Sequence, residues 1–134
     1  MKLFLMDVLC CPLCKESLKL IVLSWSERSK SLVGESLDEF VGRFEEIKGR
    51  LSSKIDEEKM KEMEIDYGIL YCKSCKRWYP IGCTIRGIPE LYYPDKLRDK
   101  RKELRFLKKW ADKLPDEILY RSLPWNLSDS EVDD

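Results

Sequence analysis

The chain of 134 residues contains no histidine and no glutamine, and Asn126 is its one asparagine. Without histidine, it lacks the side chain that most often serves as a general base near neutral pH. It also has neither a glycine-rich phosphate loop nor a dinucleotide-binding motif. These absences predict that the chain is not itself an enzyme.

The missing amides are replaced by charged residues, which make up 37% of the chain. A bias toward Lys, Glu and Arg at the expense of thermolabile residues is typical of proteins from thermophiles, so we expect a thermophilic source. The net charge is zero because 25 basic residues balance 25 acidic ones. Global charge therefore predicts attraction to neither nucleic acid nor membrane.

Long apolar runs are also missing. The first eleven residues, MKLFLMDVLCC, are apolar but short, are interrupted by Asp7 and lack a signal-peptide cleavage site. No other run approaches the roughly 20 residues needed to span a bilayer. We expect a cytoplasmic protein with no membrane partner.

Six cysteines are present, and four of them form two C-x-x-C pairs. In a cytosolic chain this spacing favours a metal over disulfides. A tetrahedral Zn²⁺ held by four thiolates leaves no open coordination position, so the predicted metal is structural rather than catalytic. The predicted Zn²⁺ ligands are Cys11, Cys14, Cys72 and Cys75.

Two further cysteines complicate this assignment. Cys10 is an alternative to Cys11, but only Cys11 places Pro12 inside the turn, so we favour Cys11. Cys83 follows Gly82 and has no partner at metal spacing, which indicates a small buried side chain. Lys15 and Lys76 each follow a cysteine pair, and we expect these cations to favour the thiolate form.

The hydrophobic pattern predicts an α+β fold. Strand patterns cover residues 17–23, 67–72, 77–81 and 84–88, with Pro80 and Pro89 at strand ends or edges. Residues 24–31 read as a linker. Helical spacing predicts one helix from Glu35 to about Leu51 and a second over residues 56–64. A last helix is expected over residues 94–114, followed by a helical turn over 115–121 and an acidic tail.

The order of these motifs resembles a known family. The segments MKLFLMDVLCCPLC and GILYCKSCKRWYPIGCTIRGIPELYYP are similar to the small zinc-binding activator subunits of methyltransferases in archaea and eukaryotes. The shared pattern is a Cys-Pro-x-Cys turn, a strand ending in a second cysteine turn, an aromatic-Pro-Ile step and Gly-Ile-Pro. Residues 94–134 extend past this pattern.

The resemblance implies a zinc-ribbon-like antiparallel sheet built from both chain ends, residues 1–25 and 67–134, with a helical insert over 26–66. It implies a non-catalytic subunit that forms heterodimers with several S-adenosylmethionine-dependent methyltransferases acting on tRNA, rRNA or a translation release factor. Contact with nucleic acid would be indirect, through the complex. The implied partner interface consists of Ile85, Arg86, Gly87, Ile88, Pro89, Leu91 and Tyr92.

Alternatives remain open at this point. The apolar cluster around Ile88 is equally expected to pack under the C-terminal helix. The runner-up function is a zinc-ribbon protein that binds nucleic acid itself, through Lys73, Lys76, Arg77, Arg86 and the basic segment 96–109. A third possibility is a rubredoxin-like iron protein.

Overall fold

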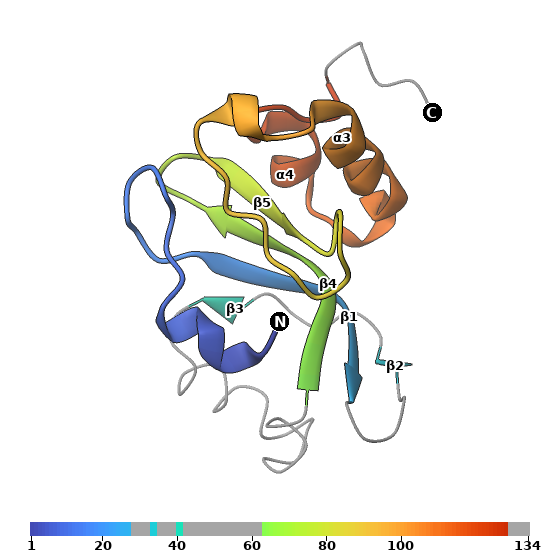
Figure 1. Ribbon diagram of the computed structural model, residues 1–134. Coiled ribbons are helices and arrows are strands. Elements are labelled where there is room, and N and C mark those ends of the chain that lie inside the picture. Colours follow the sequence, from blue (N-terminus) through green and yellow to red (C-terminus); the bar gives the residue numbers. More distant parts are fainter. Residues whose placement is uncertain (28–32, 35–39, 42–62, 129–134) are drawn as a thin grey trace.

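The computed structural model describes residues 1–27, 33–34, 40–41 and 63–128 (Figure 1). The main strands are β1 (Lys19–Glu27), β4 (Met63–Cys72) and β5 (Arg77–Ile81). Two further strands of two residues each, β2 (Val33–Gly34) and β3 (Phe40–Val41), pair with β1. The helical elements are η1 (Leu3–Asp7), η2 (Asp95–Leu97), α3 (Lys100–Lys109), η3 (Ala111–Lys113) and α4 (Asp116–Arg121).

All strand pairs in the sheet are antiparallel, and the strand order is β2-β1-β4-β5, with β3 also pairing with β1. The pairing of β1 with β4 runs from Lys19 opposite Tyr71 to Glu27 opposite Met63. Strands from before and after residues 28–62 therefore lie side by side, and the predicted antiparallel sheet of an α+β fold is present.

Side chains alternate between the two faces of this sheet, as the strand period of two requires. On β5, Tyr79 and Ile81 join one buried cluster with the N-terminal residues Met1 and Leu3. Trp78 points to the opposite face and packs with residues of α3 and α4. Figure 1 shows η1 on one side of the sheet and the two α-helices on the other.

The outer edge of β5 is covered by later parts of the chain. The amide of Trp78 donates to the Leu123 carbonyl at 3.0 Å, and the Leu123 amide donates to the Lys76 carbonyl at 2.7 Å. Farther along, the amide of Glu90 donates to the Pro80 carbonyl at 2.9 Å. Pro80 is tolerated because β5 is an edge strand of the sheet, as predicted.

The N-terminal half corrects several expectations. Residues 24–27, predicted as a linker, continue β1, where Trp25 lies opposite Ile65. Residues 40–41, predicted inside a helix, form β3, and Met63–Glu64 belong to β4 rather than to a helix end. In each case pairing with a distant strand outweighs the local pattern, polar at residues 24–27 and helical at the other two places. The other residues of the two predicted helices lie outside the described residues, so the helical insert stays a prediction.

Two expectations for the C-terminal half are also wrong. Residues 84–88 form bends and a turn instead of a strand, because positive φ angles of 86° at Gly82 and 83° at Gly87 turn the backbone away from β5. The predicted helix over 94–114 is divided into η2, α3 and η3, with Asp99 capping the start of α3. The helical turn at 115–121 is confirmed as α4. Within the described ranges, no helix has the length and apolar character to cross a membrane.

Candidate metal centre

Two short turns present the four predicted ligands. Cys11 and Cys14 lie in the turn between η1 and β1, where the Cys11 amide donates to the Glu16 carbonyl at 2.9 Å. Cys72 ends β4, and Cys75 lies in the turn to β5. Pairing of β1 with β4 places Lys19 opposite Tyr71, which brings both turns to the same end of the sheet.

The four sulfur atoms lie within 4.8 Å of one another, and the Sγ atoms of Cys14 and Cys72 are 3.4 Å apart. Tetrahedral Zn²⁺ with Zn–S bonds of about 2.3 Å requires S···S separations of about 3.8 Å. Cys11 and Cys72 are buried, and the other two thiols are half-buried. The cluster therefore fits one ion of this size with four sulfur ligands.

The surroundings of the cluster favour a negative charge on Cys11. Burial would raise the pKa of this thiol, but a hydrogen bond with the Tyr79 hydroxyl at 3.3 Å and bonds from the Cys14 and Leu13 backbone bring it to about 7. Hydrogen bonding to Cys14, together with burial, raises the pKa of Cys75 to about 12. Thiols this close cannot all ionise unless a cation compensates their negative charges. A bound metal ion supplies that positive charge.

The two lysines after the cysteine pairs have a geometric role that the sequence did not predict. Lys15 has φ 67° and Lys76 has φ 59°, so both turns end in the left-handed region. The Lys15 ammonium donates to the Pro12 carbonyl at 3.2 Å. Both turns therefore fold back in the same way after their second cysteine.

The remaining cysteines lie apart from the cluster. Cys10 pairs through its backbone with Ser17 and is not among the grouped sulfur atoms. Cys83 is half-buried near α3, where its thiol donates to the Lys102 carbonyl at 3.7 Å. Burial, followed by the charges of Glu90 and Glu103, raises the pKa of Cys83 to about 12, so this thiol stays neutral.

The predicted interface segment lies partly at the surface. Ile85, Ile88 and Tyr92 are 62%, 49% and 47% exposed, and Arg86 is exposed as well. Leu91 is half-buried against the core on the η1 side of the sheet, and Gly87 and Pro89 are half-buried. The alternative that this whole cluster packs under the C-terminal helix is therefore wrong for Ile85, Ile88 and Tyr92.

Two residues contact or line a site although the sequence analysis assigned them no role there. Tyr79 contacts Cys11 although 68 positions separate them. Glu90 is a buried carboxylate on the segment that follows the Ile88 turn. Tyr79 is marked only as the aromatic position of the family pattern, and no local pattern marks Glu90. Their contacts could not be predicted because their neighbours come from distant parts of the chain.

Comparison with curated proteins and with solved structures gave no match. One family, described as Trm112p-like protein, matches residues 2–82, a range that contains both cysteine turns and β1, β4 and β5. The match covers more than half of the chain and includes all four clustered thiols. The chain therefore belongs to the Trm112p-like family, whose members are non-catalytic activator subunits of methyltransferases.

Proposed function

We propose that this chain is a zinc-stabilised subunit that binds and activates S-adenosylmethionine-dependent methyltransferases acting on tRNA, rRNA or a translation release factor. It would form heterodimers with more than one such enzyme in the cytoplasm of a thermophile. Family membership supports the class of partner, and the exposed apolar segment supports the mode of binding.

The proposed partner surface is the segment 85–92. Nine large apolar side chains are exposed in the described part of the chain. Three of them, Ile85, Ile88 and Tyr92, lie in this segment, and Tyr93 and Leu97 follow it. A contiguous exposed apolar patch marks a protein contact more often than a free surface. The outer edge of β5 is already hydrogen-bonded to other parts of this chain, so a partner cannot add a strand there. The proposed contact is therefore made by the side chains of segment 85–92.

We propose that the zinc ion stabilises the fold of the chain rather than taking part in a reaction. With four cysteine ligands it would lock the turn before β1 to the turn after β4, and it would supply no open position for a substrate. Metal binding in such sites contributes directly to folding, with about 10–16 kcal/mol of apparent binding energy in zinc-finger peptides.

The zinc proposal predicts about one zinc ion per chain by metal analysis. Cys72→Ser removes a buried ligand from the cluster and should lose both the metal and much of the solubility of the chain. Cys83→Ser, which changes a cysteine outside the cluster, should keep both. An unchanged zinc content in Cys72→Ser would rule out this site, and iron in place of zinc would favour the rubredoxin-like alternative.

The partner proposal is tested by Ile88→Glu. In the free chain Ile88 is 49% exposed, so the substitution should leave zinc content and stability nearly unchanged. In the complex the new carboxylate would be buried without a partner, at a cost of several kcal/mol. We expect the wild-type chain to co-purify with methyltransferases from its native host and Ile88→Glu to lose them.

Leu123→Glu is the matched control, because Leu123 is 48% exposed and lies outside the proposed surface. It should retain the methyltransferases. If both variants keep the partners, the binding surface lies elsewhere on the chain. If the wild-type chain captures no methyltransferase, the proposed function itself fails.

A second candidate function, direct binding of nucleic acid, is favoured by one groove of about 360 Å³. Its lining includes the ring of Tyr67 and the cations Arg86, Lys102, Arg105 and Lys109. Arg77, which the sequence assigned to this surface, is instead buried, pairs with Asp95 and lies over the Tyr93 ring. RNA affinity of the isolated chain that falls steeply with salt would support this function.

A further inference from the structure

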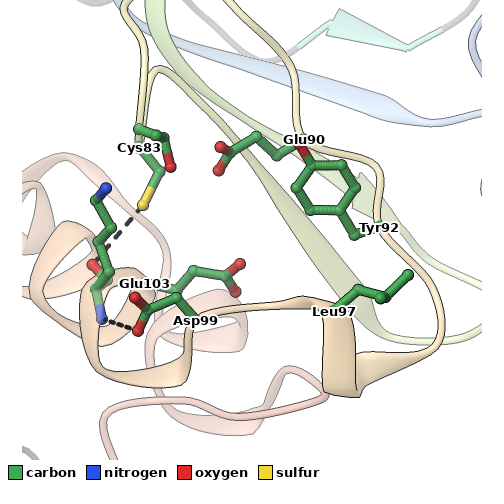
Figure 2. A pocket seen from close by; sticks show the side chains of 8 residues that line it. Cys83, Glu90, Tyr92, Leu97, Asp99 and Glu103 are labelled. Atoms are coloured by element: carbon green, nitrogen blue, oxygen red, sulfur yellow. Dashed lines mark hydrogen bonds between the residues drawn. The ribbon is translucent and has the colours of Figure 1, made fainter.

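A small cavity lies between the turn after β5, the segment leading to η2 and the start of α3 (Figure 2). Its volume is about 90 Å³, the space of a few water molecules. The cavity has room for the end of one side chain and not for a nucleotide. Carboxylates from three positions line it, namely Glu90, Asp99 and Glu103.

Glu90 is the unusual member of this set. The residue is only 7% exposed, and its backbone is held in place by the bond from its amide to the Pro80 carbonyl. Figure 2 shows its carboxylate pointing into the cavity, toward Cys83. Within residues 1–27, 33–34, 40–41 and 63–128, this carboxylate makes no hydrogen bond and no ion pair. The Glu90 oxygens keep some contact with solvent, but the side chain is largely buried and has no protein partner among the described residues. A cationic ligand would therefore add a charge-assisted hydrogen bond that the described part of the chain does not supply.

The neighbouring charges leave the cavity negative. The Arg98 guanidinium forms an ion pair with Glu103, in which Arg98 Nη2 lies 2.6 Å from Glu103 Oε1. The Asp99 carboxylate accepts the Lys102 amide at 3.1 Å, and the Lys102 side chain contributes one positive charge to the wall. Three carboxylates and one cation, Lys102, thus line the cavity, and Arg98 balances Glu103 from outside the lining. The thiol of Cys83 adds no charge because its pKa is raised by burial and by these carboxylates.

We propose that this cavity binds the guanidinium or ammonium end of a basic side chain from the partner methyltransferase. The cavity is continuous with the proposed partner surface, since Tyr92 lines it and belongs to that surface. Leu97, 60% exposed, lines the same cavity and extends the apolar rim. A cation inserted beside Glu90 would gain a charge-assisted hydrogen bond away from bulk water. This inference rests on the proposed function for the source of the cation.

The cation chemistry is tested without any partner. The ¹⁵N-labelled, zinc-loaded full chain is titrated with methylguanidinium, methylammonium and the neutral analogue methylurea, and amide shifts around Cys83, Glu90 and Asp99 are followed by NMR. We expect saturable shifts with one or both cations and none with methylurea. The tighter cation shows whether the cavity suits arginine or lysine.

Glu90→Gln should weaken cation binding at least tenfold, because it removes the unpaired charge and keeps the shape. Asp99→Asn provides a second variant that preserves the N-cap of α3 and should weaken binding severalfold. Asp112→Asn, which removes an exposed carboxylate outside the cavity, is the matched control and should bind as wild type. Equal binding of methylurea, or unchanged binding in Glu90→Gln, would overturn the assignment.

The role of the cavity in partner binding is tested with a methyltransferase that co-purifies with the wild-type chain. Glu90→Gln should lower its affinity at least tenfold and flatten the dependence of that affinity on salt. If Ile88→Glu abolishes the complex while Glu90→Gln leaves it unchanged, the cavity is not the docking point and the proposed function still stands. If the cations bind but no methyltransferase does, the proposed function fails. The cation site then remains, but its link to a methyltransferase is refuted.

Discussion

Tyr79 connects the cysteine cluster to the rest of the fold. It is fully buried in β5, and its hydroxyl lies 3.3 Å from the Cys11 sulfur. Burial, followed by the bond with Cys11, raises the pKa of this hydroxyl well above its usual value, so it stays protonated and can donate to a thiolate. Outer-shell donors of this kind orient metal ligands and tune their charge.

Removal of this hydroxyl tests its role at the scale of one atom. Tyr79→Phe keeps the buried ring and should lower the free energy of unfolding by about 0.5–1.5 kcal/mol. Zinc affinity should fall by about 10–100-fold, as measured by competition with a chromophoric chelator. Tyr120→Phe removes a hydroxyl from a 48% exposed residue and should change neither quantity. Equal zinc affinity in both variants would show that Tyr79 serves packing alone.

At the scale of elements, α3 is fixed over the sheet by a buried ion pair. Arg98 precedes the helix and makes three hydrogen bonds to the Glu103 carboxylate, at 2.6, 3.0 and 3.1 Å. The same guanidinium donates to the Trp78 carbonyl of β5 at 2.9 Å, and the Trp125 indole donates to Glu103 at 3.0 Å. The pair therefore joins β5, α3 and the C-terminal segment.

Breaking this pair should be costly, because it leaves a buried charge without its partner. Glu103→Gln keeps the shape of the side chain and should lower the free energy of unfolding by about 3 kcal/mol in urea denaturation. The double variant Arg98→Met, Glu103→Leu removes both charges and should recover most of that loss. A double variant as unstable as Glu103→Gln would mean that the hydrogen bonds to Trp78 and Trp125 matter more than the charges.

At the scale of the whole molecule, one sheet carries two separate cores. The N-terminal residues pack with the cluster that includes Cys11 and Cys72 on one face, and the C-terminal helices cover the other. The family match ends at residue 82, before the helices that complete the second core. Those helices cover Trp78 and Ile69, which would otherwise expose a large apolar face.

The second core should supply much of the stability of the molecule. Leu107→Ala removes a fully buried side chain from α3 and should cost about 2–5 kcal/mol. Leu97→Ala changes a leucine that is 60% exposed and should stay within about 0.5 kcal/mol of wild type. Zinc content should be unchanged in both, since neither residue belongs to the core cluster on the side of the four grouped cysteines. A destabilised Leu97→Ala would show that the free chain uses this residue for packing.

Some features follow from the sequence because neighbouring residues determine them. The C-x-x-C spacing specifies each cysteine turn, the pattern of residues 77–81 specifies β5, and Pro115 followed by Asp116 and Glu117 starts α4. The family resemblance rests on the same local motifs. These are short-range effects, and tertiary contacts do not overturn them here.

Other features were decided only by the tertiary structure. Strand β1 continues through Trp25 because Trp25 pairs with Ile65 of β4. Residues 84–88 do not continue β5, because the chain turns at Gly82. The grouping of Cys11 with Tyr79, and of Glu90 with Asp99, depends on chain segments that meet only after folding. Hydrogen bonds and charges act over a few ångströms in space whatever the separation along the chain, so local pattern alone cannot reveal them.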